Sequence, residues 1–259
     1  MRVAVLNDIH GNLDALDAVL DEVRRSGADH IVVGGDVLVG PMSREALERL
    51  TTIDLPVDFI YGNCEIDVLT QLSGREPARV PEIYRPAIRW TAEQLSPDQR
   101  QLVASWPMTL RLDIDGVGRT LFCHGTPRDE NECFTARTAE ALLRPLVDPL
   151  DVALLVCGHT HMQFDRLIGQ TRIVNAGSVG MPFGEPGADW LLIDRTPQLR
   201  HTPYDREKAA ARFRATSYPR AEEFADKYVL NPPPAAQMLE VYSRAELKST
   251  ARFATETQR

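Results

Sequence analysis

The sequence predicts an α/β protein, a four-layer α-β-β-α sandwich of two mixed sheets flanked by helices, with a helical extension at the C-terminus. Short apolar runs alternate with helix-like stretches through the first half, an order typical of a largely parallel sheet with right-handed crossovers. The second half has more strand-like runs and fewer long helices, and a mixed two-sheet sandwich with outer helices accommodates both halves. We expect one domain over residues 1–204 and the extension over 205–259, packed on the same domain.

The first half opens with a β-rich run and an amphipathic helix, in which Asn12 can cap the start and Gly27 can close the end. The expected elements of this half are a strand at 2–7, a helix at 12–27, a strand at 30–36, a helix at 44–52, a strand at 57–63 and partly helical, Pro-punctuated residues at 74–107.

The second half is richer in strands, and the dipeptide at 169–170 is expected to form a hairpin turn. The expected strands are 108–114, 119–125, 152–159, 163–168, 171–177, 189–195 and 198–204. From residue 205 onward we expect two or three helices, interrupted by "NPPP" at 231–234, with a frayed end after about residue 250.

Composition limits the classes of function. The formal net charge of −8 argues against an extended nucleic-acid interface, because phosphate contacts need clustered Lys and Arg. A phosphate substrate in a small pocket stays possible, since a metal ion can supply local positive charge. No apolar run reaches the length of a membrane span, no secretory signal is recognisable, and the four cysteines form no disulfide framework. We therefore expect a cytoplasmic protein without a membrane partner.

Side chains of metal-binding type follow five of the predicted strands. Because ligands bind just past the carboxyl ends of strands in open α/β sheets, we expect these side chains to converge on one rim. An Asp after one strand is usually a turn former or a helix cap, but unrelated turns do not explain the whole set. Its seven members are Asp8, His10, Asp36, Asn63, His124, His159 and His161.

The segments "NDIHGNLDAL", "GGDVLVGP", "GNCE", "CHGTP" and "CGHTHMQF" resemble the calcineurin-like metallophosphoesterase family, as does "IVNAGSVGMP". Within that family the resemblance is to the small bacterial and archaeal YfcE-like phosphodiesterases. It covers about residues 2–204, and the segment from 205 onward lies outside it.

The resemblance implies two divalent metal ions, of Mn, Fe, Zn or Ni, and the donor types suit these metals. Asp8, His10 and His161 would hold one ion, Asn63, His124 and His159 the other, and Asp36 would bridge them. The implied reaction is hydrolysis of a phosphodiester by a metal-bridged hydroxide. Asp36, Asn63 and His124 would form the catalytic set, with His124 or an ordered water assisting the leaving group.

Cys64 is the one departure from the family's site motifs. The family pattern in this loop is G-N-H followed by an acid, and its histidine is thought to protonate the leaving group. Here Gly62 and Asn63 precede Cys64 and Glu65. Loss of a general acid typically costs about 10²–10⁴-fold when the leaving group is poor. We interpret Cys64 as a loop filler or a residue lining the pocket, and covalent catalysis by it is the least favoured role.

Five further residues are candidates for the wall of the substrate pocket. Glu65 is interpreted as an orienting acid of the loop, Arg128 as a bidentate donor to phosphate or a surface ion pair, and Ser178 as a contributor of backbone groups. Gly125 and Thr126 follow a predicted ligand, so their backbone should lie near the site.

Other functions compatible with the fold are a phosphomonoesterase or protein phosphatase and a non-catalytic metal-binding or scaffold protein. The retromer subunit of the same superfamily lacks the loop histidine and works by protein interaction. Retention of all seven ligand positions favours the enzyme. The expected substrate is a small phosphoester, a class that includes nucleotide-like esters. The C-terminal helices are a candidate contact surface for a homo-oligomer.

Overall fold

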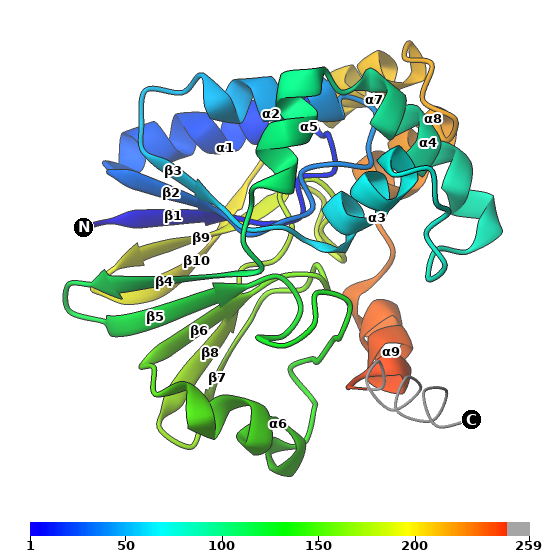
Figure 1. Ribbon diagram of the computed structural model, residues 1–259. Helices are drawn as coiled ribbons and strands as arrows, with labels where there is room; N and C mark the ends of the chain where they lie inside the picture. Colours follow the sequence, from blue (N-terminus) through cyan, green and yellow to red (C-terminus); the bar gives the residue numbers. More distant parts are fainter. Residues whose placement is uncertain (248–259) are drawn as a thin grey trace, which may run out of the picture.

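Two five-stranded sheets lie face to face at the centre of the computed structural model, which describes residues 1–247 (Figure 1). The first sheet has the strand order β10-β9-β1-β2-β3, in which β1, β2 and β3 are mutually parallel, β9 runs antiparallel to β1, and β10 runs antiparallel to β9. Its strands are β1 (Val3–Leu6), β2 (His30–Val33), β3 (Val57–Phe59), β9 (Ala188–Asp194) and β10 (Thr196–Thr202).

The second sheet has the order β4-β5-β6-β8-β7, in which β5, β6 and β8 are parallel and the two edge strands run antiparallel to their neighbours. Its strands are β4 (Thr109–Ile114), β5 (Gly118–Cys123), β6 (Leu154–Cys157), β7 (Phe164–Ile168) and β8 (Thr171–Asn175). The hairpin between β7 and β8 turns at residues 169–170, as the sequence predicted.

Helices cover the outer face of each sheet, which completes the four predicted layers (Figure 1). The helices on the side of the first sheet are α1 (Leu13–Ser26), α2 (Ser43–Thr51), α3 (Asn63–Leu72), α4 (Arg85–Gln94) and α5 (Pro97–Ala104), with the 3₁₀ turn η1 (Glu82–Tyr84). Helix α6 (Glu140–Val147), continued by the 3₁₀ turn η2 (Asp148–Leu150), covers the second sheet.

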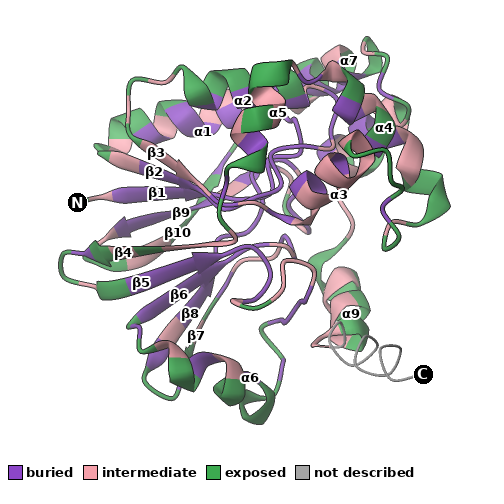
Figure 2. Cartoon of the chain, viewed as in Figure 1, coloured by how far each residue is buried: buried purple, intermediate pink, exposed green. Residues whose placement is uncertain are grey.

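Alternation along the strands distributes the apolar side chains between the layers. Val3 and Val5 of β1 face the second sheet, where they join a core that includes Phe122. Ala4 and Leu6 of the same strand face the outer helices. Figure 2 shows the central strands of both sheets mostly buried and the edge strands partly exposed. The strand ends that carry the predicted ligands are therefore fixed from both sides.

The C-terminal segment forms a helical extension, whose first part, residues 206–230, packs on the first sheet's helices, whereas its last helix contacts the loop after β5. Its elements are α7 (Arg206–Arg214), α8 (Ala221–Phe224), the π-helical turn η3 (Ala225–Leu230) and α9 (Ala235–Ala245). Phe213 of α7 is fully buried in a cluster with Ala87 of α4, and Arg212 forms an ion pair of 2.8 Å with Asp14 of α1. The frayed end expected after about residue 250 lies outside the described residues.

Local signals in the sequence correctly predicted the first helix, but two other helices, α3 and α6, were not predicted. Asn12 caps α1 through its side chain and Gly27 ends it in the left-handed conformation, as predicted. The strand expected over 57–63 stops at Phe59, because Gly62 is the N-cap of α3 and Glu65, at the third position of the helix, accepts the Gly62 N–H. Helix α6 was also not predicted; it contains Pro145, which disfavours a helical assignment.

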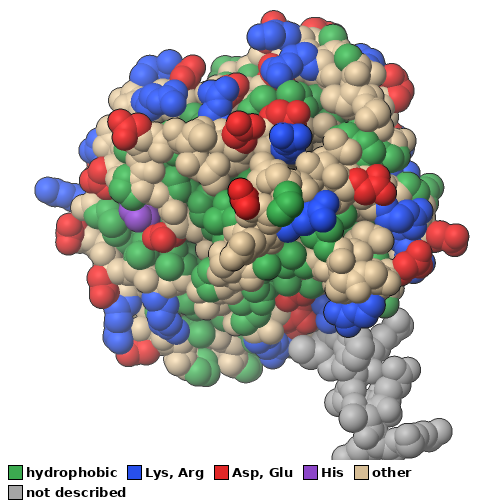
Figure 3. Space-filling model, turned by 45° about the horizontal axis from the view of Figure 1, so that its top comes forward, with side chains coloured by type: hydrophobic (Ala, Val, Ile, Leu, Met, Phe, Trp, Pro, Cys, Tyr) green, Lys and Arg blue, Asp and Glu red, His purple; other side chains and the backbone are tan. Residues whose placement is uncertain are grey.

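The surface has mixed charge. Lys and Arg side chains are interspersed with Asp and Glu over the described part of the face in Figure 3. Such a mixture is typical of a solvated surface rather than of one that follows a nucleic-acid backbone. Among residues 1–247, no helix combines the length and apolar character that crossing a membrane requires.

Replacing Phe213 by Ala tests whether the extension and the sheets unfold together. The buried ring fills a closed cluster, so we expect Phe213→Ala to lower the free energy of unfolding by about 3–5 kcal/mol in urea titrations. Leu167→Ala, at a position that is 67% exposed, is the control and should change it by about 0.5 kcal/mol or less. A main unfolding transition that does not shift in Phe213→Ala would mean that the extension folds as a separate unit.

Candidate metal centre

The predicted ligands come from the carboxyl ends of five parallel strands, three in the first sheet and two in the second. Asp8 and His10 follow β1, Asp36 follows β2, and Asn63 starts α3 just after β3. The other three follow the second sheet's strands, His124 after β5 and His159 and His161 after β6. The structure brings these loops together between the two sheets.

Left-handed backbone conformations shape the rim. Five of the seven predicted ligands have φ between 46° and 65°, namely Asp8, His10, Asp36, His159 and His161. Non-glycine residues in this region cost about 1–3 kcal/mol each and concentrate at functional sites. Backbone hydrogen bonds between the loops after β1 and β2 hold two of them, since Asp8 N–H donates to Gly35 and His10 N–H donates to Asp36.

Asp8 is a fully buried carboxylate at the centre of the site. Its Oδ2 accepts the His159 N–H at 3.0 Å, whereas its Oδ1 has no hydrogen-bond partner among the described residues. That Oδ1 lies 3.2 Å from His161 Nε2 and 3.8 Å from His124 Nε2. A buried carboxylate oxygen without a donor, surrounded by imidazole nitrogens, is the arrangement expected of a metal ligand.

Asp36 connects the two sides of the rim. Its Oδ1 accepts the Cys64 N–H at 2.9 Å, and its Oδ2 lies 3.4 Å from His124 Nε2 and 3.8 Å from His10 Nε2. At Gly62, a Cβ atom would stand 2.2 Å from Asp36 Oδ1, so only glycine allows the loop before α3 to approach this carboxylate.

Two histidines have their tautomers set by backbone carbonyls. His124 Nδ1 lies 2.9 Å from the Gly34 carbonyl, and His161 Nδ1 lies 2.9 Å from the Met181 carbonyl. A carbonyl accepts only from N–H, so in the deprotonated form that binds a metal each ring directs the lone pair of Nε2 into the site. This is the usual way in which a protein orients a metal-binding imidazole.

The charges of the site favour ionised carboxylates. Burial raises the pKa of Asp8, but the charges of His161 and His124 outweigh burial and lower it overall. The pKa of Asp36 is likewise lowered, because the charge of His124 and a hydrogen bond to it outweigh burial. Burial lowers the pKa of His124, yet Asp36 and Asp8 raise it to about 10. Two buried carboxylates thus require positive charge beside them.

Among residues 1–247, three groups of side chains place ligand atoms within 4.8 Å of one another: Asp8, His10 and His161; His10, Asp36 and Cys64; and Asp8, Asp36 and His124. The first is one of the two predicted ion sites. His10 Nε2 lies 3.2 Å from His161 Nε2. Ligand atoms bound to one ion at about 2.0–2.2 Å are about 3 Å apart, so this spacing suits a shared metal.

The other predicted ion site is less completely assembled. Asn63 Oδ1 lies 3.1 Å from His124 Nε2, so both can face the same ion beside Asp36. The ring of His159 stands edge-on to that of His124, with centroids 5.2 Å apart, and its Nε2 is 3.2 Å from the Asn131 carbonyl. Burial lowers the pKa of His159 to about 4, so its ring is neutral and Nδ1 is left to bind.

The site and fold together match a known family. A model of the calcineurin-like phosphoesterase superfamily domain matches residues 1–196. The chain belongs to this family. Membership places it among metal-dependent phosphoesterases, as the sequence motifs indicated.

Related sequences and structures agree with this assignment. The chain is 28% identical over 232 residues to the uncharacterized protein MJ0912 of Methanocaldococcus jannaschii, covering 80% of this chain and 89% of that one. It is 28% identical over 203 residues to the phosphodiesterase YfcE of Escherichia coli K12, covering 75% and 88%.

Two solved structures share the fold. The hypothetical protein PH1004 of Pyrococcus horikoshii superimposes with a TM-score of 0.77 at 20% identity, covering 90% of this chain and 99% of that one. A metallophosphoesterase of Sphaerobacter thermophilus gives a TM-score of 0.69 at 24% identity, covering 87% and 98%. The fold class predicted from the sequence is confirmed.

Glu65, which the sequence analysis assigned to the substrate pocket, lies underneath the phosphoesterase site. Its fully buried carboxylate accepts the backbone N–H groups of Asp36, Leu38 and Gly62 at 2.7–3.0 Å. Burial and the charge of Asp36 raise its pKa to about 7, against the three N–H donors, which lower it. Its position identifies it as a brace that fixes the Asp36 loop.

The other pocket candidates also serve the loops around the ligands. Arg128 makes a bidentate ion pair with the buried carboxylate of Glu132, at 2.8 and 2.6 Å, which corresponds to the ion-pair alternative. The Thr126 hydroxyl donates to the same carboxylate. Gly125 packs so closely that a Cβ would stand 2.5 Å from the Glu132 carbonyl. The Ser178 hydroxyl donates to the Asp8 carbonyl at 2.7 Å.

Cys64 is the pocket candidate that faces a cavity. Its side chain is 8% exposed, and with His10 it lines a cavity of about 140 Å³. Burial, followed by the charges of Asp36 and Glu65, raises the pKa of its thiol well above the ordinary value.

The sequence analysis missed the aromatic side chains around the ligands. Phe183 stacks on His161 with ring centroids 5.2 Å apart, and Tyr242 of α9 lies 6.3 Å from the ring of His159. The Tyr242 hydroxyl donates to the His159 carbonyl at 3.4 Å. The available signal was the recurrence of aromatic residues through the otherwise charged C-terminal segment.

The role of Glu65 as a brace leads to a stability prediction. In Glu65→Gln one acceptor oxygen becomes a donor that faces backbone N–H groups, so we expect the free energy of unfolding to fall by about 1–3 kcal/mol. The measurement is urea unfolding monitored by circular dichroism. Glu45→Gln, the same change on an exposed position of α2, should stay within about 0.5 kcal/mol. Equal, small effects in both variants would contradict the assigned role.

Proposed function

We propose that this protein is a dimetal phosphoesterase that hydrolyses phosphodiesters. The observation that carries the proposal is the rim itself, where two buried carboxylates lie among histidines whose Nε2 atoms point inward. The family assignment and the 28% identity to the phosphodiesterase YfcE support the same conclusion.

The donor set would suit two divalent ions of Mn, Fe, Zn or Ni, and Asp36 would contribute a carboxylate beside both His10 and His124. When bound, such ions supply positive charge that lowers the pKa of a water molecule and neutralises a phosphoryl group. A pocket that holds +4 from the ions and −2 from Asp8 and Asp36 keeps a net positive charge, although the protein as a whole carries −8. An anionic phosphoester is therefore attracted to the site.

The chain's own groups have distinct parts in this proposal. Asp8, Asp36, Asn63 and the histidines bind and orient, and the strained loops keep their ligand atoms in place before substrate arrives. His124 Nε2 faces Asn63 and Asp36, so we assign His124 to the metal site and the protonation of the leaving group to water. Without a side-chain acid at position 64, esters with acidic leaving groups should react best.

Removal of a ligand tests the proposed reaction. Protein loaded with Mn²⁺ should turn over bis-p-nitrophenyl phosphate faster than p-nitrophenyl phosphate, and a chelator should abolish turnover. Loss of a group that hydrogen-bonds to a metal ligand typically lowers metal affinity or activity about 10–100-fold. Asp36→Asn alters a ligand itself, so we expect kcat/KM to fall more than 100-fold and the amount of bound metal to fall as well. Asp113→Asn, at an exposed strand position, is the matched control and should retain both.

Metal content, measured by mass spectrometry, separates the enzyme from the alternatives. Protein that carries metal but turns over neither ester would favour the scaffold function instead. A preference for the monoester would favour a phosphomonoesterase.

Cys64→His tests the missing general acid. The side chain at this position faces a cavity, so a histidine there can reach a leaving group. We expect at least a tenfold rise in kcat on diphenyl phosphate, whose phenolate leaves poorly, and little change with p-nitrophenolate. The rise in kcat should stay near tenfold, because the Glu65 carboxylate already accepts backbone N–H groups and is not available to orient the new ring. An unchanged rate in Cys64→His, with Cys64→Ala as control, would show that the pocket needs no acid here.

A further inference from the structure

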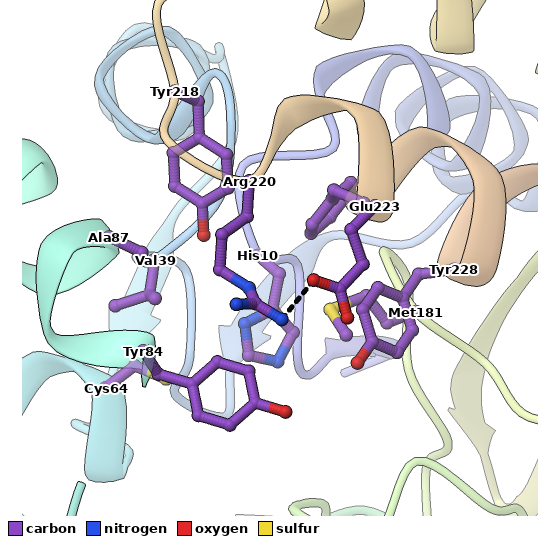
Figure 4. A pocket seen from close by; sticks show the side chains of 11 residues that line it. His10, Val39, Cys64, Tyr84, Ala87, Met181, Tyr218, Arg220, Glu223 and Tyr228 are labelled. Carbon is purple, nitrogen blue, oxygen red and sulfur yellow. Dashed lines mark ion pairs between the residues drawn. The ribbon is translucent and has the colours of Figure 1, made fainter. Parts of the chain in front are cut away.

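The C-terminal extension supplies five of the eleven residues that line the cavity beside His10 and Cys64. Residues Tyr218, Arg220, Glu223, Phe224 and Tyr228 all line it. They lie beyond residue 196, where the match to the family model ends. The opposite wall includes Tyr84 of η1 and Ala87 of α4 (Figure 4). The extension therefore forms part of the wall of the cavity next to the predicted metal ligands.

The lining of this cavity is aromatic and apolar. Figure 4 shows the rings of Tyr84, Tyr218 and Tyr228 around it, from three separate segments of the chain. Val39 and Met181 add aliphatic and thioether surface. Such walls favour a flat, apolar group, because aromatic rings stack on it and apolar side chains exclude water from it.

The cavity carries one pair of charges, and they compensate each other. Arg220 forms an ion pair with Glu223 and lies with its Cζ 4.4 Å from the centroid of the Tyr84 ring. Its Nη1 also donates to the Ile83 carbonyl at 3.4 Å. Because Glu223 neutralises Arg220, this wall does not favour a second phosphate and is suited to an uncharged group.

The size of the cavity sets the size of that group. Its volume is about 140 Å³, and an apolar cavity of about 150 Å³ is known to hold a benzene molecule. One six-membered ring fits, and His10 in the wall places that ring next to the metal ligands.

We propose that this cavity binds a single planar ring carried by the phosphoester, as in an aryl ester or a pyrimidine nucleoside. The protein then prefers phosphodiesters with such a ring over those with a small alkyl group. This proposal rests on the proposed function, and it assigns the preference to the extension and to Tyr84.

The test compares diesters that share p-nitrophenolate as the leaving group, namely the methyl, phenyl and thymidine 5′ esters of p-nitrophenyl phosphate. With the Mn²⁺-loaded full chain we expect a KM about tenfold lower for at least one ring-bearing ester than for the methyl ester, the factor that stacking of one ring provides. The phenyl and thymidine esters distinguish an aryl group from a nucleoside. Equal KM values for all three esters would overturn the proposal.

A variant assigns the preference to the cavity. Tyr84 is 41% exposed, so Tyr84→Ala should fold, and it should reduce the KM ratio at least threefold. Ile83→Ala removes a neighbouring side chain of η1 that is 63% exposed and lies outside the cavity lining, and it should keep the ratio. A ratio that Tyr84→Ala leaves unchanged, or that Ile83→Ala reduces equally, would contradict the assignment.

A binding measurement keeps the two proposals distinguishable. Turnover of the methyl ester tests the phosphodiesterase function, and calorimetric titration with phenylphosphonate and methylphosphonate tests the cavity without turnover. We expect phenylphosphonate to bind about tenfold more tightly than methylphosphonate, and Tyr84→Ala to reduce the difference. Equal affinities in the unaltered protein would overturn the ring site even if all the esters are hydrolysed.

Discussion

The structure depends on the burial of two ionised carboxylates, Asp8 and Asp36, between two sheets. Each is at most 2% exposed, and burial alone would drive both toward the neutral form. The surrounding histidines oppose this, and a divalent ion would oppose it more strongly. Uncompensated buried charge is among the most destabilising features a fold can contain. The rim therefore needs positive charge, which the histidines supply and which a bound divalent ion would increase.

The positions of these charges are fixed by backbone groups more than by side-chain packing. Left-handed residues turn the loops inward, backbone hydrogen bonds connect the loops after β1 and β2, and the buried Glu65 carboxylate gathers three N–H groups beneath Asp36. Glu65 lies beside the candidate metal ligands, and both of its oxygens accept backbone N–H groups. It therefore has a structural role that does not depend on a histidine at position 64.

The extension gives the site its individual character. Its first part, with Tyr218 and Tyr228, closes one side of the space beside His10 and Cys64, and Tyr242 of α9 lies against His159 on another side. The rim of candidate metal ligands is thus combined with a wall from outside the residues that match the family model. In the two proposals made above, the sheets supply the reaction and the C-terminal segment the substrate preference.

The sequence by itself determined the sandwich and the seven polar residues of the rim, because strand and helix periodicity and the residues at strand ends are local features that a chain carries in its order. The sequence did not identify the backbone groups that Glu65 braces, the partner Glu132 of Arg128 or the tyrosine-lined cavity. The brace and the cavity bring together residues that are far apart in the chain. The Arg128–Glu132 pair lies within the loop after β5 and depends on the direction in which the buried Glu132 side chain points. Such contacts arise only when the two sheets and the extension have packed, since burial and close approach decide them.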